Sequence, residues 1–235
     1  MVRAAAVLAA GIALGVYAAT HEHFPNLSDW GDVAFLAFLV IPLMFSLVRL
    51  ALPWQALARP LWIGLTAVGL ALLTVVLSLA GLDIAANLTK LAAATAVGWW
   101  FLTFFEAAWW VALIAALIVP VDLISVARGP TKTITEEQPE VFDALSVAMP
   151  IAGEDASAQL GLPDILFFAL FLGAAARFGL RRNATWALMT LSFGATLALA
   201  IALDEAGVAA LPLLSLAFLL VNADLLWRSI RTRSA

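Results

Sequence analysis

Long apolar runs alternate with short polar interruptions along this chain of 235 residues. Runs of 18 or more apolar residues predict transmembrane helices, because about 20 helical residues are needed to cross the hydrocarbon core of a bilayer. The stretch 85–127 must hold two of them, with a turn near Glu106, since a single helix of that length would measure about 64 Å. We expect about eight spans, at residues 2–20, 32–51, 61–82, 86–104, 107–127, 162–180, 183–203 and 208–228. The pattern predicts an all-α polytopic membrane protein.

Composition supports this class and excludes several functions. The chain is 64% hydrophobic and only 12% charged, which argues against a water-soluble globule. It has no cysteine, so a disulfide framework, a thiolate metal site and a cysteine nucleophile are excluded. The net charge of −4 gives no reason to expect a nucleic-acid partner. The apolar start up to Thr20 is compatible with a secretory signal peptide, but we interpret it as an uncleaved first span.

The placement of lysine and arginine predicts the orientation of these spans. With eight spans and a cytoplasmic N-terminus, one side of the membrane receives nine of the twelve basic residues, which are Arg3, Arg49, Arg59, Arg177, Arg181, Arg182, Arg228, Arg231 and Arg233. The other side receives Lys90, Arg128 and Lys132, together with most of the acidic residues, among them Glu136 and Glu137. Because basic residues collect in cytoplasmic loops, both termini are expected inside the cell.

The longest polar interruption lies at residues 128–160 and divides the chain unequally. We expect four N-terminal helices in residues 1–104 and a second region, 105–235, that contains this extramembrane loop. The loop can be interpreted as a flexible acidic segment or as a gate or docking strand, in which Val141–Met149 would be the apolar part.

Two aspartates stand at positions where the helices are otherwise apolar. Asp122 lies one turn before the end of the fifth span, and Asp164 lies one turn into the sixth. A carboxylate at membrane depth costs at least a few kcal/mol and suggests a functional site. If the two helices are antiparallel neighbours, the carboxyl groups fall at similar depth, and one of them retains a proton. Alternatively each aspartate caps a helix, and Gly-Leu-Pro-Asp164 is typical of a helix start.

Three motifs around these residues resemble those of the presenilins and signal peptide peptidases, the GxGD-type intramembrane aspartyl proteases. Pro120-Val-Asp122-Leu-Ile-Ser-Val126 resembles the Tyr-Asp helix of that family, and Leu160-Gly-Leu-Pro-Asp164-Ile is similar to its Gly-x-Gly-Asp helix. Ala210-Leu211-Pro212 stands where the family carries Pro-Ala-Leu. The motifs occur in the family's order, over about residues 105–228.

The resemblance implies an aspartic endopeptidase of the prokaryotic inner membrane that cleaves transmembrane peptide substrates within the lipid bilayer, without a cofactor or metal. Asp122 and Asp164 would be the catalytic pair. The substrate-binding residues would be Gly161, Leu162, Pro163, Ala210, Leu211 and Pro212. The family usually has nine spans, so eight would mean a presenilin-like fold that lacks one N-terminal span. Losing that span from the signal peptide peptidase orientation also gives two cytoplasmic termini.

The sequence departs from the family's pattern at three positions. Val121 replaces a tyrosine, Pro163 replaces the second glycine, and Ala209 replaces the proline of Pro-Ala-Leu. Proline removes an N–H and fixes φ next to Asp164, so a catalytically impaired homologue that acts as a membrane binding protein is an alternative. A proton- or cation-coupled transporter could also use buried carboxylates, although no internal repeat is visible. A prepilin-type peptidase would normally have a lysine soon after the second aspartate, where Ile165-Leu-Phe-Phe stands. The oligomeric state is left open.

Overall fold

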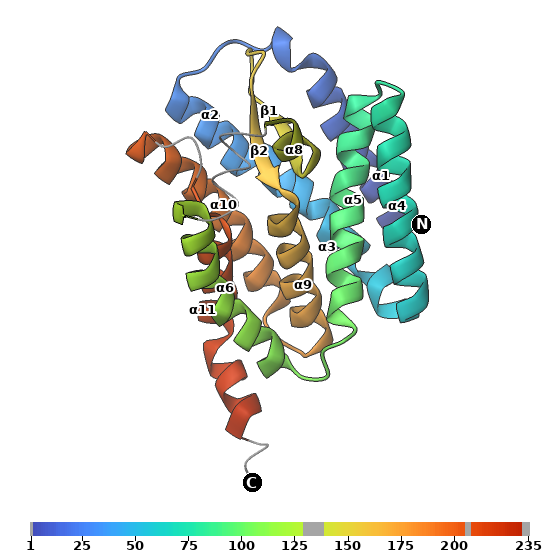
Figure 1. The fold of residues 1–235 in the computed structure, drawn as a ribbon, viewed down its shortest axis with the longest axis vertical. Helices are drawn as coiled ribbons and strands as arrows, with labels where there is room; N and C mark the ends of the chain where they lie inside the picture. Colours follow the sequence, from blue (N-terminus) through green and yellow to red (C-terminus); the bar gives the residue numbers. More distant parts are fainter. Residues whose placement is uncertain (1, 129–138, 205–207, 232–235) are drawn as a thin grey trace.

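The computed structural model describes residues 2–128, 139–204 and 208–231, which form a helical bundle with one small hairpin at its upper end (Figure 1). The first half of the chain contains α1 (Val2–Thr20), η1 (His21–His23), α2 (Asp29–Phe35), η2 (Leu36–Val40), α3 (Ile41–Leu57), α4 (Pro60–Leu79) and α5 (Asp83–Leu102). The second half contains α6 (Ala108–Arg128), α8 (Pro139–Ala144), β1 (Ser146–Pro150), β2 (Ser157–Gly161), α9 (Leu162–Arg177), α10 (Arg182–Leu203) and α11 (Leu211–Arg231).

A helix lies at the position of each predicted span, and the turn expected near Glu106 separates α5 from α6. In the described part of the chain, six helical segments are long and apolar enough to cross a membrane. Helices α5 and α9 are not among them, and α9 has only 16 residues. The structure therefore confirms a mostly helical protein in which several helices are long and apolar enough to cross a membrane.

The region 128–160 differs from the flexible loop that the sequence suggested. Residues 129–138, with Lys132, Glu136 and Glu137, lie outside the described residues. The remainder folds as helix α8 and the antiparallel hairpin β1–β2, a sheet that the all-α prediction did not include. The segment Val141–Met149 is not one docking strand either, because its first half is helical and only its second half belongs to β1.

Helix α9 lies at the centre of the bundle, and its residues from Phe168 to Ala175 are all buried. The Phe45 ring of α3 lies between Phe168 of α9 and Phe193 of α10, with ring centroids 3.8 and 4.9 Å away. Helix α5 covers another side of α9 at close range, because Gly98 has no side chain and faces the backbone carbonyl of Leu166. The helix that carries Asp164 is therefore fixed by packing on several sides.

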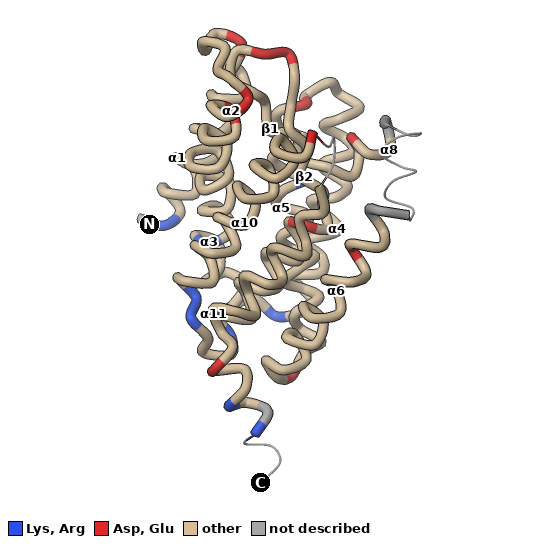
Figure 2. Tube along the Cα trace, turned by 90° about the vertical axis from the view of Figure 1, so that its left-hand side faces the viewer, with Lys and Arg blue, Asp and Glu red and all other residues tan. Residues whose placement is uncertain are grey.

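Charged side chains separate along the long axis of the bundle (Figure 2). Most basic residues lie toward the end where the C-terminus emerges, and most acidic residues lie toward the opposite end. At the basic end, Arg181 donates to both carboxylate oxygens of Asp224, and its backbone N–H donates to the buried Asn222 side chain. Arg49 lies over the Trp186 ring, 4.9 Å from its centroid. This separation agrees with the asymmetry seen in the sequence.

Candidate active site

Asp122 is half-buried on helix α6, which packs mainly along α11 and also touches α9. Its carboxylate accepts a hydrogen bond from the backbone N–H of Leu211. Leu211 is the first residue of α11, where a backbone N–H has no acceptor inside the helix. The start of α11 thus supplies a donor, and the favourable end of a helix dipole, to an acid that is remote in sequence.

Asp164 is half-buried and is the third residue of α9, directly after strand β2. Its carboxylate accepts a hydrogen bond from the backbone N–H of Gly161, the N-cap residue. An acid at the third position that reaches back to the N-cap N–H is one half of a capping box. A Cβ atom at Gly161 would lie 2.9 Å from Oδ2 of Asp164, so the glycine gives the carboxylate its room.

The two aspartates come together at the contact between α6 and α9. They are close enough for the charge of Asp122 to act on the Asp164 carboxylate. Each has one backbone donor, which comes from Leu211 for Asp122 and from Gly161 for Asp164. Two carboxyl groups that feel each other's charge can differ in protonation, so one can act as an acid and the other as a base on a bound water.

The other residues predicted for the site surround this pair. Leu162 and Pro163 are the first two residues of α9, and Pro163 is exposed. Proline costs no helical hydrogen bond there, because the first N–H groups of a helix lack acceptors. Ala210 precedes α11 and its carbonyl accepts from the N–H of Leu214, 3.0 Å away. Leu211 and Pro212 are buried. The backbone groups of Ala210 and Leu211 therefore have partners within the chain.

Strand β2 presents an open edge on the side of Asp164. Just outside the hairpin, the N–H of Leu162 donates to the carbonyl of Leu145, and the N–H of Ile151 donates to the carbonyl of Ala156. With the register of the strands, these two bonds mean that odd-numbered residues of β1 bond to even-numbered residues of β2. The N–H and C=O groups of Ser157 and Gln159 consequently point away from β1. Within the described residues, these backbone groups have no hydrogen-bond partner. The Gly161 N–H points the same way and reaches Asp164.

Sequence reasoning missed the residues that hold the hairpin in place. Asn87 and Lys90 of α5 bind the backbone of the β1 region from the side opposite to β2. Their spacing of three residues places both on one face of α5, one turn after Asp83, and this row of polar side chains on a mostly apolar helix is the signal that could have found them.

The described residues contain no group of three or more histidine, aspartate or glutamate side chains arranged to hold a metal ion. Comparison of the chain with protein-family models and with curated proteins finds no match.

Proposed function

We propose that this protein is an intramembrane aspartyl endopeptidase that cleaves transmembrane segments or signal-peptide remnants. The observation that carries the proposal is the meeting of Asp122 and Asp164 beside the open edge of β2. The resemblance to presenilins and signal peptide peptidases supports the same conclusion. In this proposal the fold is presenilin-like with eight spans, and both termini lie on the cytoplasmic side of a prokaryotic inner membrane.

The chemistry follows from the carboxyl pair. One carboxylate takes a proton from a water molecule as the water oxygen attacks the scissile carbonyl carbon, and the other carboxyl group donates its proton to the carbonyl oxygen. A proton then passes to the amide nitrogen as the C–N bond breaks. The backbone donors from Leu211 and Gly161 hold the two carboxyl groups in place during these transfers.

The open edge of β2 accounts for how a substrate reaches the pair. A peptide bond inside a helix is shielded, so the substrate must unwind, and an unwound strand in a membrane needs hydrogen-bond partners for its backbone. Ser157 and Gln159 offer such partners by strand addition. A chain paired with Gln159 reaches the level of Gly161 two residues later, about 7 Å further along, where the Asp164 carboxylate lies. Deleting residues 157–160 should therefore abolish cleavage.

The test uses the purified full chain in lipid nanodiscs and a synthetic single-span peptide. The peptide has an apolar core of about 20 residues, interrupted by Gly-Pro near one end to favour unwinding. Products are identified by mass spectrometry. The native chain is expected to cleave, whereas Asp122→Asn and Asp164→Asn are expected to be inactive. Asp224→Asn is the matched control, because Asp224 is exposed and pairs with Arg181 at the basic end of the bundle.

The same variants separate catalysis from helix capping. Asn at position 164 keeps an oxygen that accepts from the Gly161 N–H, whereas Ala does not. Asp164→Asn should therefore lose activity and keep its thermal stability, and Asp164→Ala should lose both. Cleavage by Asp164→Asn at the native rate would refute the proposal. Binding of the peptide by the native chain without any product would instead favour the impaired homologue that acts as a membrane binding protein.

A further inference from the structure

The outer edge of β1 is closed by a side chain that imitates a neighbouring strand. The N–H of Ala148 donates to Oδ1 of Asn87 over 2.9 Å, and Nδ2 of Asn87 donates to the carbonyl of Ala148 over 2.6 Å. A carboxamide has the same donor and acceptor as a peptide group. Asn87 therefore satisfies both backbone groups that a further strand would need at this position.

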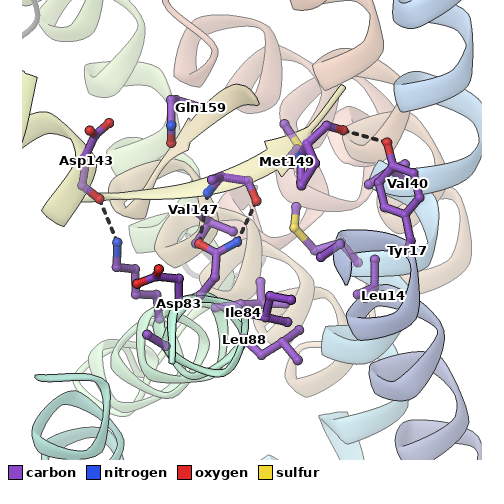
Figure 3. A pocket seen from close by; sticks show the side chains of 18 of the residues that line it. Leu14, Tyr17, Val40, Asp83, Ile84, Leu88, Asp143, Val147, Met149 and Gln159 are labelled. Atoms are coloured by element: carbon purple, nitrogen blue, oxygen red, sulfur yellow. Dashed lines mark hydrogen bonds between the residues drawn. The ribbon is translucent and has the colours of Figure 1, made fainter. Parts of the chain in front are cut away.

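Two more side chains extend this closure along the strand. Nζ of Lys90 donates to the carbonyls of Ser146 and Asp143, at 3.1 and 2.7 Å. The hydroxyl of Tyr17 donates to the carbonyl of Pro150 at 2.6 Å (Figure 3). Pro150 has no N–H to offer. All three outward-facing carbonyls of β1 thus have a donor from α5 or α1, whereas the outward groups of Ser157 and Gln159 on β2 have none among the described residues.

These bonds span a cavity and do not merely accompany tight packing. A cavity of about 340 Å³ lies between α1, α3, α5 and the hairpin, and Tyr17, Asn87 and Lys90 are among its lining residues (Figure 3). Val147 and Met149 of β1 are buried in the hydrophobic core beside this cavity, and the hydrogen bonds add a constraint on the outer edge of β1 that apolar packing alone does not give.

Helix α5 also contacts α9 directly, through Gly98 and through Leu102 and Trp99 against Gly173. One helix therefore holds both the hairpin and the helix on which Asp164 lies. We propose that Asn87 is a positioning residue that closes the β1 edge, so that an extended peptide pairs with β2 alone, and that fixes β2 relative to Asp164. The peptide-pairing part of this inference rests on the proposed function, but the closure of the β1 edge does not.

Amide hydrogen exchange tests the closure without any need for cleavage. In full-length protein in nanodiscs, Asn87→Leu should raise the exchange rate of the peptide that covers residues 145–152 about tenfold or more, as expected when a pair of half-buried hydrogen bonds is lost. Thr89→Val is the matched control on α5, because Thr89 bonds to Thr74 and Ala86 and not to the hairpin. Asn87→Asp keeps the acceptor but loses the donor, so its exchange rate at residues 145–152 should lie between those of the leucine and valine variants. It replaces Asn87→Leu in the test if the leucine variant does not fold.

The edge selectivity is tested in the inactive Asp122→Asn background with the single-span Gly-Pro peptide. Peptide addition should slow exchange at residues 157–159 and leave 146–150 unchanged, and adding Asn87→Leu should reduce that protection at least severalfold. Equal exchange of 145–152 in Asn87→Leu and Thr89→Val would overturn the inference, as would undiminished protection of 157–159 in the leucine variant. Failure of the proposed function would give a different result. The native chain would make no product and the peptide would protect neither strand from exchange. Asn87→Leu and Thr89→Val would still differ in the exchange rate of the hairpin.

Discussion

Gly161→Ala should move the Asp164 carboxylate while leaving the fold intact. The added Cβ would lie 2.9 Å from Oδ2 of Asp164. An ordinary carbon–oxygen contact is about 3.3–3.6 Å, so the carboxylate must shift by roughly 0.5 Å. The displaced atom is the end of a side chain, and Gly161 has φ −60° and ψ 141°, which alanine adopts readily. The substitution therefore acts on the site and not on the backbone.

The expected size of the effect follows from that displacement. A catalytic group held about 0.5 Å from its productive position is at the limit of tolerance, and about 1 Å costs roughly 100-fold. We expect kcat/KM for the single-span peptide to fall about 10- to 100-fold. The free energy of unfolding should change by less than about 1 kcal/mol, because alanine restricts the unfolded chain and offsets the strained hydrogen bond.

The assay measures initial rates of peptide cleavage in nanodiscs together with thermal unfolding of the same samples. Gly69→Ala is the matched control, because Gly69 is an exposed helical residue of α4 with open space around the position of an added Cβ. It should keep full activity. Native kcat/KM in the Gly161→Ala protein, at unchanged stability, would refute the assignment of the Asp164 carboxylate as a catalytic group held by Gly161.

Three further substitutions probe the supports of the site. Gly98→Ala should lower the free energy of unfolding by about 1–3 kcal/mol, because the new methyl group overlaps the Leu166 carbonyl on α9; a native unfolding curve in a denaturing-detergent titration would contradict this. Asn222→Leu should cost about 1–3 kcal/mol in the same titration, since it removes a buried amide that accepts from the backbone N–H of Arg181 and donates to the buried Thr185 hydroxyl. Pro163→Gly should keep kcat/KM within a few-fold and lower stability by about 0.4–1 kcal/mol through the freer unfolded chain, so a large loss of activity would show that the proline itself shapes the site.

The helices could be predicted from the sequence because apolar length is a local signal. Each predicted span contains a helix. The unusual position of Asp122 and Asp164 within apolar segments marks them as candidates, and their catalytic role stays a prediction. The hairpin could not be predicted in the same way. Strand β1 has five residues and ends in proline, and its outer edge is satisfied by side chains of α5 and α1. That stabilisation depends on contacts between distant parts of the chain, which no local pattern records.

The same distinction explains which parts of the site were found. The acids are visible as isolated charges, but their donors are backbone groups whose identity depends on how α6, α9 and α11 pack. The Ala210–Pro212 segment could be assigned to the site only through its resemblance to Pro-Ala-Leu, which suggested contact with substrate. In the structure the contact of Leu211 is with Asp122. Any effect of Leu211 on a substrate would therefore act through the Asp122 carboxylate.

The two interpretations of Asp164, helix cap and catalytic acid, are compatible. Reaching back to the Gly161 N–H satisfies a donor at the start of α9, and it also turns the carboxylate toward the edge of β2 that carries the free groups of Ser157 and Gln159. Capping alone requires neither an open strand edge nor a second acid. Because Asp122 has its own donor from another helix, each carboxylate keeps its place when the other changes protonation. Two acids with separate backbone donors, next to an open strand edge, are therefore consistent with the proposed peptide hydrolysis.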